Sequence, residues 1–470
     1  KICTMPTIKI HDTLTNSKNE LEVNKKIRIY LCGVTVYDDS HIGHARTIII
    51  FDTLRRFLES KKIHVELIQN FTDVDDKIIK KANDENVEPS IISDRFIKNY
   101  FDDFSRLNIK NATQYPKATE HIPDMINLIQ NLIEKEFAYV AKNGVYFKVA
   151  KFTEYGKLSK KKTEDLESGA RIEIDESKDS PLDFALWKFS ETIPFWDSPW
   201  GKGRPGWHIE CSAMSIKYLG ENFDIHGGGR DLIFPHHENE IAQSESFTGK
   251  QFAKTWMHAG MITINGEKMS KSLGNIKSVN HVLTNWGPNV IRLFCMSGHY
   301  SKPIDYTEDL LKENLVKWRQ VETCYYELIL GDGSGDVKTV KEMIESHERK
   351  FDDAMSDDFN TSLALTSFFD MIKELNALAS EEKISKQISD IAIPILDRLL
   401  NILGLKITKV TDEEKASIIE LIKNRDEMRI KKQFDEADEI RDKILSLGIT
   451  LIDHKSKTLW MKKEIIKSDS

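Results

Sequence analysis

The order of strand and helix patterns near the start of the chain constrains the fold more than any other sequence feature. Residues 27–33 alternate apolar and polar positions and predict a buried strand, which ends beside Cys32. Ser40 can cap a helix over 41–60, and residues 63–69 predict a second strand. Strand, helix and strand in this order form the βαβ unit of a doubly wound sheet. Such sheets bind ligands at the carboxyl ends of their strands, where Cys32 would lie.

Similar patterns return later in the chain, after a stretch of different character between residues 90 and 190. Strands are predicted near 223–226 and 257–264, with a glycine turn at 227–229 and a helix over 235–246. Beyond about residue 305 the chain reads as charged amphipathic helices. We therefore predict an α/β fold: a doubly wound (Rossmann-like) parallel-sheet domain with an insertion, then an all-helical bundle and a small C-terminal α/β tail. The expected domains are the first half of the sheet (1–90), a connective insertion (91–200), the second half of the sheet (201–304), a helical bundle (305–405) and a C-terminal region (406–470).

Composition limits the classes of protein that the chain can represent. Its 470 residues are 40% hydrophobic and 30% charged, which is typical of a globular protein with several domains. No apolar run approaches the ~20 residues that cross a bilayer, so a cytoplasmic address and no membrane partner are expected. The five scattered cysteines argue against a disulfide framework and leave thiols available for a metal. A net charge of −8 provides no general attraction to nucleic acid.

The stretch 207–240 concentrates residue types that bind metal ions. If the run from Pro235 is helical, His236 and Glu240 project from one face, whereas His237 and Glu238 point elsewhere. Together with Cys211 they offer three ligands that zinc accepts, and a fourth is still required. A buried cysteine beside a surface helix rich in His and Glu would explain the same residues equally well.

Two short motifs suit phosphate chemistry. His41-Ile42-Gly43-His44 lies at the predicted start of a helix, where unpaired amides and the helix dipole favour an anion. Lys268-Met269-Ser270-Lys271-Ser272 follows the last predicted strand of the second half, and its lysines could neutralise a pyrophosphate leaving group. Two capping histidines and a solvated basic loop are the structural alternatives.

Together and in this order, the two motifs resemble the HIGH and KMSKS signatures of class I aminoacyl-tRNA synthetases. Further runs narrow the resemblance to the cysteinyl-tRNA synthetase family, over nearly the whole chain. They are CGVTVYD at 32–38, GRPGWHIECSAM at 203–214, DIHGGG at 224–229, FPHHENEIAQ at 234–243, KMSKSLGN at 268–275 and DDFNT at 357–361. Two departures are Ser362, where proline is usual, and Phe434, where tryptophan is common.

The resemblance implies one zinc ion per chain and supplies its fourth ligand. The implied ligands are Cys32, Cys211, His236 and Glu240. It also suggests substrate contacts by Thr72, by Trp207 as an apolar wall and by Asp231 as partner of the substrate ammonium. Ordinary core packing for Trp207 and a helix-start carboxylate for Asp231 remain open. A metal-bound thiolate would separate cysteine from serine, which a pocket that reads shape alone separates by only ~1–3 kcal/mol.

The implied reaction activates L-cysteine with ATP and Mg²⁺, releases pyrophosphate and transfers the cysteinyl group to tRNA(Cys). His41, His44, Lys268 and Lys271 are expected to stabilise the developing charge. The implied nucleotide-binding residues are Gly33, Thr35, His41, Gly43, His44, His226, Gly227, Gly228 and Lys271. A monomer is expected.

Similarity also assigns catalysis to residues 1–90 and 201–304, stem contact to the bundle over 305–405, and anticodon binding to the C-terminal helices and tail over 406–470. Five lysines lie between Lys455 and Lys467 around Trp460, which suits phosphate contact combined with base stacking. Arg425, Arg429 and Phe434 belong to a second candidate patch, although a solvated helix face explains that patch equally well.

Two rival functions follow from the same motifs. An ATP-dependent cysteine:amino-sugar ligase of this fold would share the zinc and nucleotide motifs but lack most of the tail after residue 405. A non-catalytic tRNA- or zinc-binding module would not be expected to keep intact HIGH and KMSKS motifs. The tail and both motifs are present.

Overall fold

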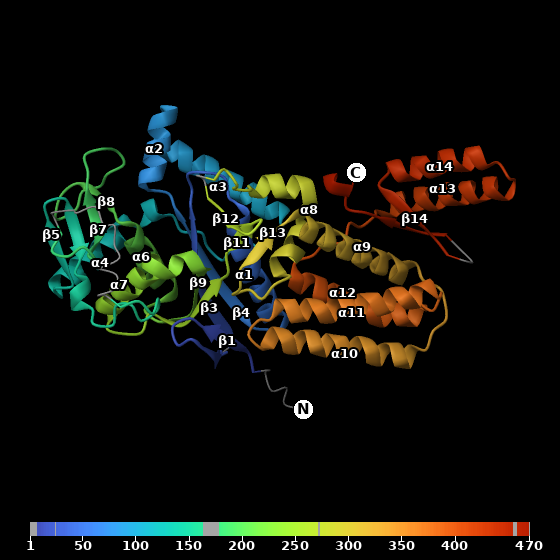
Figure 1. Ribbon diagram of the computed structural model, residues 1–470, viewed down its shortest axis with the longest axis horizontal. Helices are drawn as coiled ribbons and strands as arrows, with labels where there is room; N and C mark the ends of the chain where they lie inside the picture. The colour runs from blue at the N-terminus through green and yellow to red at the C-terminus, as the bar shows by residue number, and fades with distance from the viewer. Residues whose placement is uncertain (1–6, 24, 163–177, 271–272, 455–457, 470) are drawn as a thin grey trace.

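The computed structural model describes residues 7–23, 25–162, 178–270, 273–454 and 458–469. Within these ranges a parallel sheet lies in the middle of an elongated molecule, with a mixed insertion at one end and a helical bundle at the other (Figure 1). The predicted fold class is therefore confirmed. No helix in the described ranges is both long enough and apolar enough to span a bilayer.

The central sheet has the strand order β10-β9-β3-β4, and all its pairs are parallel. Its strands are β3 (Lys26–Thr35), β4 (His64–Thr72), β9 (Phe223–Gly229) and β10 (Ala253–Ala259). The first half of the sheet adds β4 on one side of β3, and the second half adds β9 and β10 on the other. β3 is thus the strand at which the order reverses, and such a switch point is where open α/β sheets bind ligands.

Helices pack against this sheet as the βαβ pattern predicts. α1 (Ile42–Ser60) follows β3, and α6 (Trp207–Leu219) and α7 (Glu238–Thr248) flank β9. The strand predicted over 257–264 is instead two strands, β10 and β11 (Ile262–Ile264). Gly260 lies between them. It has to be glycine, because an added Cβ there would lie 2.1 Å from the carbonyl oxygen of Lys302. β11 pairs with the short β12 (Glu267–Lys268) and with β13 (Ile304–Tyr306).

The insertion contains more sheet than its sequence indicates. α2 (Asp76–Glu85) precedes it, α3 (Pro89–Arg106) spans its start, and α4 (Ile122–Glu134) lies within it. Its antiparallel sheet contains β5 (Ala138–Ala141), β6 (Gly144–Phe147) and β7 (Phe184–Phe189), together with β8 (Gly203–Pro205) just past its expected end. The sequence pattern indicates a strand only near residues 145–149, which corresponds to β6. The other three strands are too short for a clear period of two, and β7 is separated from β6 by a long connection.

The remaining chain is largely helical, as predicted. α8 (Val279–Met296) leads to the bundle α9 (Glu308–Leu330), α10 (Val337–Ser356), α11 (Thr361–Ser380) and α12 (Lys386–Leu403). The C-terminal region follows with α13 (Asp412–Ile430), α14 (Phe434–Ser446), the hairpin β14 (Ile449–Asp453) and β15 (Thr458–Lys462), and η5 (Lys467–Asp469). An N-terminal hairpin of β1 (Lys9–Asp12) and β2 (Ser17–Glu20) lies beside β10.

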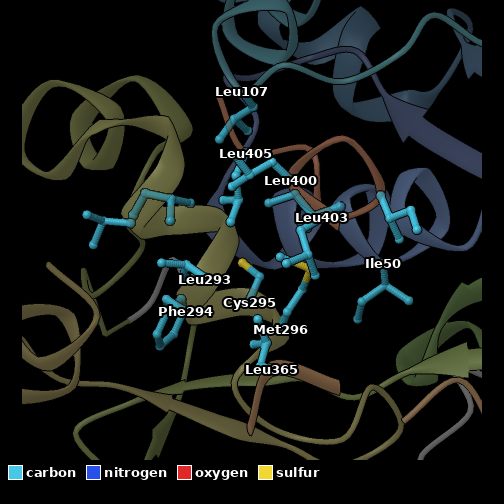
Figure 2. Close-up of a cluster of buried hydrophobic side chains, with 14 of the residues drawn as sticks. Ile50, Leu107, Leu293, Phe294, Cys295, Met296, Leu365, Leu400, Leu403 and Leu405 are labelled. Carbon is cyan, nitrogen blue, oxygen red and sulfur yellow. The ribbon is translucent and has the colours of Figure 1, made fainter. Parts of the chain in front are cut away.

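A continuous apolar core joins α1 and α8 to the end of α12. Figure 2 shows Leu293 and Cys295 of α8 close to Leu400 and Leu403 of α12. Inside this junction the buried Arg292 guanidinium donates to the Asp52 carboxylate at 2.7 Å. The same guanidinium donates from Nε to the Leu403 carbonyl at 2.8 Å, so α8 is bonded to α1 on one side and to the end of α12 on the other.

Candidate active site and metal centre

Four side chains predicted to bind zinc converge at the switch point of the sheet. The Cys32 Sγ lies 3.8 Å from the Cys211 Sγ, 3.6 Å from the His236 Nε2 and 3.3 Å from the Glu240 Oε1. One ligand atom from each of the four lies within 4.8 Å of every other. Two thiols, an imidazole and a carboxylate at this spacing can surround one tetrahedral zinc ion.

Four separate elements bring these ligands together. Cys32 comes from β3, Cys211 from α6, and Glu240 from the first turn of α7. His236 lies in the short helical segment η4 (Ile233–His237), which continues into α7. The expected i, i+4 arrangement is present, because the His236 Nε2 lies 3.0 Å from the Glu240 Oε1.

The charge state of the cluster provides a test of whether it suits a cation. Burial opposes a charged imidazole, yet the Glu240 carboxylate raises the pKa of His236 to about 10. Burial likewise opposes a carboxylate, but His226 and His236 lower the pKa of Glu240 to about 2. Burial, with Cys211 and Glu240 beside it, raises the pKa of the Cys32 thiol well above its usual range. The carboxylate and sulfur atoms thus favour positive charge at their centre, and the donor set fits a divalent metal ion.

A second layer of side chains holds the four donors. The His208 Nδ1 lies 2.9 Å from the His236 Nδ1, and the His226 Nε2 lies 2.8 Å from the Glu240 Oε2. Trp207 stacks on the His236 ring at 4.3 Å between centroids and is 40% exposed. Partners of this kind orient metal ligands, and their loss typically weakens metal binding ~10- to 100-fold.

The expectation for His237 was wrong, whereas that for Glu238 was right. The His237 ring does not point away from the cluster, since its Nε2 lies 3.3 Å from the Cys32 Sγ. It turns inward because η4 is wound differently from a regular α-helix and contains the non-helical Phe234. The Glu238 carboxylate points away and accepts hydrogen bonds from the amides of Gly156 and Ser159 in the insertion.

The two histidines of the HIGH motif cap α1 reciprocally. The His41 Nδ1 accepts from the His44 amide at 3.3 Å, and the His44 Nδ1 accepts from the His41 amide at 3.4 Å. Their rings stack at 3.6 Å. Because each Nδ1 is an acceptor, the ring proton of a neutral imidazole is on Nε2. Burial lowers the pKa of His44 well below its usual range, which favours that neutral form.

The KMSKS segment lies directly beside the HIGH motif. An added Cβ at Gly43 would come within 3.2 Å of the Met269 Cε, so glycine permits the two segments to touch. The Ile42 amide also donates to the Lys277 carbonyl at 2.9 Å. Lys268 is exposed at the end of β12, whereas Lys271 lies outside the described residues. The two motifs, which are far apart along the chain, are therefore neighbours in the folded protein.

The glycines assigned to nucleotide binding have packing roles in this structure. Gly227–Gly229 form the end of β9 and not the predicted turn. A Cβ at Gly227 would lie 2.1 Å from the Phe51 ring, and one at Gly228 would lie 2.8 Å from the His237 ring. At Gly33 a Cβ would overlap the Asn70 carbonyl oxygen at 1.5 Å. Close approach of neighbouring elements therefore explains these glycines without a nucleotide.

The other predicted substrate residues have varied surroundings. Thr35 and Thr72 are register partners at the carboxyl ends of β3 and β4, beside the cluster. His226 is fully buried behind Glu240 and does not reach the surface. Asp231 is exposed on η3 (Arg230–Leu232).

The predicted tRNA-binding residues divide into two groups. The expectation that Trp460 stacks on a base is corrected, because its ring is 4% exposed and packs 5.6 Å from the Tyr326 ring. Arg425 is also buried and lies 3.4 Å from the Asp453 carboxylate, so it supports the β14–β15 hairpin. Arg429 is exposed, and Phe434 is 61% exposed.

Sequence reasoning missed the residues that surround the cluster. Asn70 and His208 contact the predicted ligands Cys211 and His236, whereas Thr13 and His258 are connected to Cys32 through His237. His208 follows Trp207 in a run already singled out, so its position was a usable signal. Thr13 belongs to a distant hairpin, and nothing in the local pattern marks it.

Comparison with known proteins agrees with this geometry. The family model for the class I (C) tRNA synthetase catalytic domain matches residues 18–316, and the DALR domain model matches 350–408. The chain is 49% identical to a cysteine–tRNA ligase of Caldicellulosiruptor saccharolyticus, over 95% of this chain and 98% of the relative. It is 47% identical to one from Thermococcus kodakarensis, over 97% and 99%.

Solved structures extend the likeness to the fold. A Mycobacterium tuberculosis methionyl-tRNA synthetase in complex with methionyl-adenylate aligns with a TM-score of 0.64 at 14% identity, covering 81% of this chain and 92% of that one. A leucyl enzyme of Agrobacterium radiobacter aligns with a TM-score of 0.60 at 9% identity, covering 81% and 84%. At such identities the likeness concerns the fold alone.

Proposed function

Because the chain belongs to the cysteine–tRNA ligase family of class I aminoacyl-tRNA synthetases, we propose that it selects L-cysteine through a zinc ion held by Cys32, Cys211, His236 and Glu240. The proposal further holds that cysteine is activated by ATP to cysteinyl-adenylate and transferred to the 3′ end of tRNA(Cys). The convergence of those four donors on one centre is the observation that carries it.

Selection of the side chain needs more than shape. Cysteine and serine differ by one atom, and a pocket that reads shape alone separates such pairs by only ~1–3 kcal/mol. A bound zinc ion would supply a soft acceptor that prefers a thiolate to a hydroxyl. Cys211, His236 and Glu240 are buried, while Cys32 is partly exposed, so the approach for a substrate thiol is on the Cys32 side. Trp207, stacked on His236, would form one wall of that approach.

Adenylate formation requires stabilised charge more than covalent catalysis. His41 and His44 would donate from Nε2 to the α-phosphate, since their Nδ1 atoms accept backbone amides. Lys268 and Lys271 would neutralise the pyrophosphate together with Mg²⁺. Asp231 would pair with the substrate ammonium, and Thr72 would line the cysteine site.

Recognition of tRNA is assigned to the region after residue 405, with the stem-contact bundle over 305–405 between it and the catalytic halves. Arg429 and Phe434, near the junction of α13 and α14, are the exposed candidates for contact with RNA. This region also argues against the amino-sugar ligase. We propose that the chain acts as a monomer.

A metal assay combined with aminoacylation tests the proposal. The purified chain should contain about one zinc ion, charge tRNA(Cys) with cysteine and reject serine. Removal of the metal by a chelator should abolish cysteine-dependent ATP–pyrophosphate exchange, and zinc should restore it. Full exchange by metal-free protein would disprove the proposed selection.

A further inference from the structure

A chain of three polar side chains leads from the N-terminal hairpin to the metal cluster. The Thr13 Oγ1 lies 2.8 Å from the His258 Nδ1, and the His258 Nε2 lies 2.8 Å from the His237 Nδ1. The His237 Nε2 lies 3.3 Å from the Cys32 Sγ. Both rings are nearly inaccessible, and each uses both of its nitrogens in this chain. A thiol sulfur on β3 is thus connected to a hydroxyl in a separate hairpin.

The hairpin is fixed firmly enough to place the Thr13 hydroxyl. The Thr13 amide donates to the Trp256 carbonyl at 2.9 Å. The buried Asp12 carboxylate accepts from the Trp256 amide and from the amides of Leu14 and Thr15. These bonds attach the turn to β10, two residues before His258. These main-chain hydrogen bonds therefore place the Thr13 hydroxyl next to the His258 ring.

Space for the His237 ring is also provided by the fold. Gly228 has no Cβ and leaves room for that ring. A Cβ added at Gly228 would lie only 2.8 Å from the His237 ring. The His226 ring lies 4.7 Å from it at 63°, and Trp256 lies 5.3 Å away. Packing on these sides restricts rotation of His237 away from Cys32.

The Cys32 end of the chain determines which nitrogen of each ring carries the proton, because the Thr13 hydroxyl at the other end can either donate or accept. A metal-binding cysteine is a thiolate, which can only accept a hydrogen bond. The His237 Nε2 must then carry the proton, and its Nδ1 accepts from the His258 Nε2–H. The His258 Nδ1 accepts in turn, and Thr13 donates its hydroxyl proton. Burial lowers the pKa of His258 to about 3, in keeping with a neutral ring.

We propose that Thr13 and His258 are positioning residues that complete the hydrogen-bond chain behind His237 and stabilise the tautomer whose Nε2–H is directed at the Cys32 sulfur, which strengthens metal binding there. This inference rests on the proposed function, because it concerns the same metal centre. The alternative donor set Cys32, His226, His237 and Glu240 requires a lone pair on the His237 Nε2. A His237 Nε2 that donates its proton to the Cys32 thiolate has no such lone pair, so the proposal assigns the metal to the set with Cys211 and His236.

The test uses full-length variants that keep the shape of each side chain. Thr13→Val removes the hydroxyl, Thr13→Ser retains it, and Thr15→Val changes an exposed threonine in the same turn. His258→Leu breaks the chain, whereas His258→Gln keeps an N–H donor near the Nε2 position. Zinc affinity is measured by competition with a chromophoric chelator. The cobalt-substituted proteins are examined for the sulfur-to-cobalt charge-transfer band.

Loss of the chain should weaken zinc binding measurably in both Thr13→Val and His258→Leu, more in the latter, but by less than the ~10- to 100-fold typical of side chains that contact a metal ligand directly. The charge-transfer band should move to longer wavelength in both, because the sulfur loses an N–H donor. Thr13→Ser and Thr15→Val should match the unmodified chain, and His258→Gln should recover part of the affinity.

Three results would overturn the inference. Unchanged affinity in Thr13→Val would exclude a role for the hydroxyl. Weaker binding with an unshifted band would indicate loss of hairpin docking and not of the N–H···S bond. If the unmodified chain bound neither zinc nor cobalt, the proposed function would fail together with this inference. A failure seen only in the variants would leave the proposed function intact.

Discussion

The metal cluster and the C-terminal region differ in what their candidate residues have to do. At the cluster, four donors from four elements meet behind several layers of packed side chains. In the C-terminal region, two of the four candidate RNA contacts, Arg425 and Trp460, are buried and stabilise the region itself. A metal site requires particular atoms at a common centre, and those atoms can be identified by type. An RNA-binding surface requires exposure, which residue type does not reveal.

Removal of a metal ligand should give the largest effect. Cys211→Ser replaces a thiolate with a poor zinc ligand, so cysteine-dependent ATP–pyrophosphate exchange should fall further than the ~10- to 100-fold typical of outer partners. Zinc content should fall with it. The exchange assay and metal analysis are made on the same preparation.

Cys295→Ala is the matched control for this variant. Cys295 is equally buried, but it lies in the apolar junction between α8 and α12 (Figure 2). Its loss should lower stability and leave zinc content unchanged. Normal exchange by Cys211→Ser would remove the basis for assigning selectivity to the cluster.

Trp460 tests the C-terminal region, where a buried candidate residue is expected to stabilise the fold and not to contact RNA. Because its ring is buried against Tyr326, Trp460→Ala should lower the free energy of unfolding by ~3–5 kcal/mol, the usual cost of deleting a buried tryptophan. Thermal or urea unfolding measures this change without tRNA. A stable variant that had lost only tRNA binding would restore the original assignment of Trp460 as a stacking residue.

Local patterns predicted the sheet and three of the four metal donors. β3, α1 and β4 have strong patterns, and Cys32 was placed at a strand end, but its role as the fourth ligand came from the family resemblance. The glycines at 227–229 were misassigned as a turn because a glycine run does not show whether the neighbour is a ligand or another element. Their neighbours are Phe51, from α1, and His237, from η4. Such contacts join distant parts of the chain, and no local spacing encodes them.

Phe434 offers a smaller effect that is confined to tRNA. The side chain is 61% exposed at the start of α14. If it stacks on a base, Phe434→Ala should lower kcat/KM for tRNA by a factor that corresponds to ~1–3 kcal/mol of lost binding free energy, the usual range for such stacking. ATP–pyrophosphate exchange without tRNA should not change. Ile419→Ala, which removes an exposed apolar side chain from α13, is the control. Equal charging by both variants would exclude the assigned contact.

The smallest expected effect concerns how the tail is attached to the catalytic half. The Glu464 carboxylate accepts from the Asn289 amide group at 2.8 Å, on α8. Burial, and the nearby Glu322 carboxylate, raise the pKa of Glu464 to about 7. A raised pKa means that the docked tail holds the proton more tightly than the free tail. Docking is therefore fully stabilised below the usual carboxyl pKa, and that contribution is lost as the pH rises through about 7.

Between about pH 6 and 8 this loss should amount to about 1 kcal/mol. Hydrogen exchange of the amides in residues 458–469 should therefore accelerate beyond the intrinsic pH effect. Glu464→Gln should remove the excess, while Glu420→Gln, at an exposed position on α13, should retain it. Identical pH dependence in the two variants would show that a different group controls docking. Because the Ser468 hydroxyl contacts the Asn285 carbonyl on the same α8, a change in docking would reach the helix that follows the KMSKS segment.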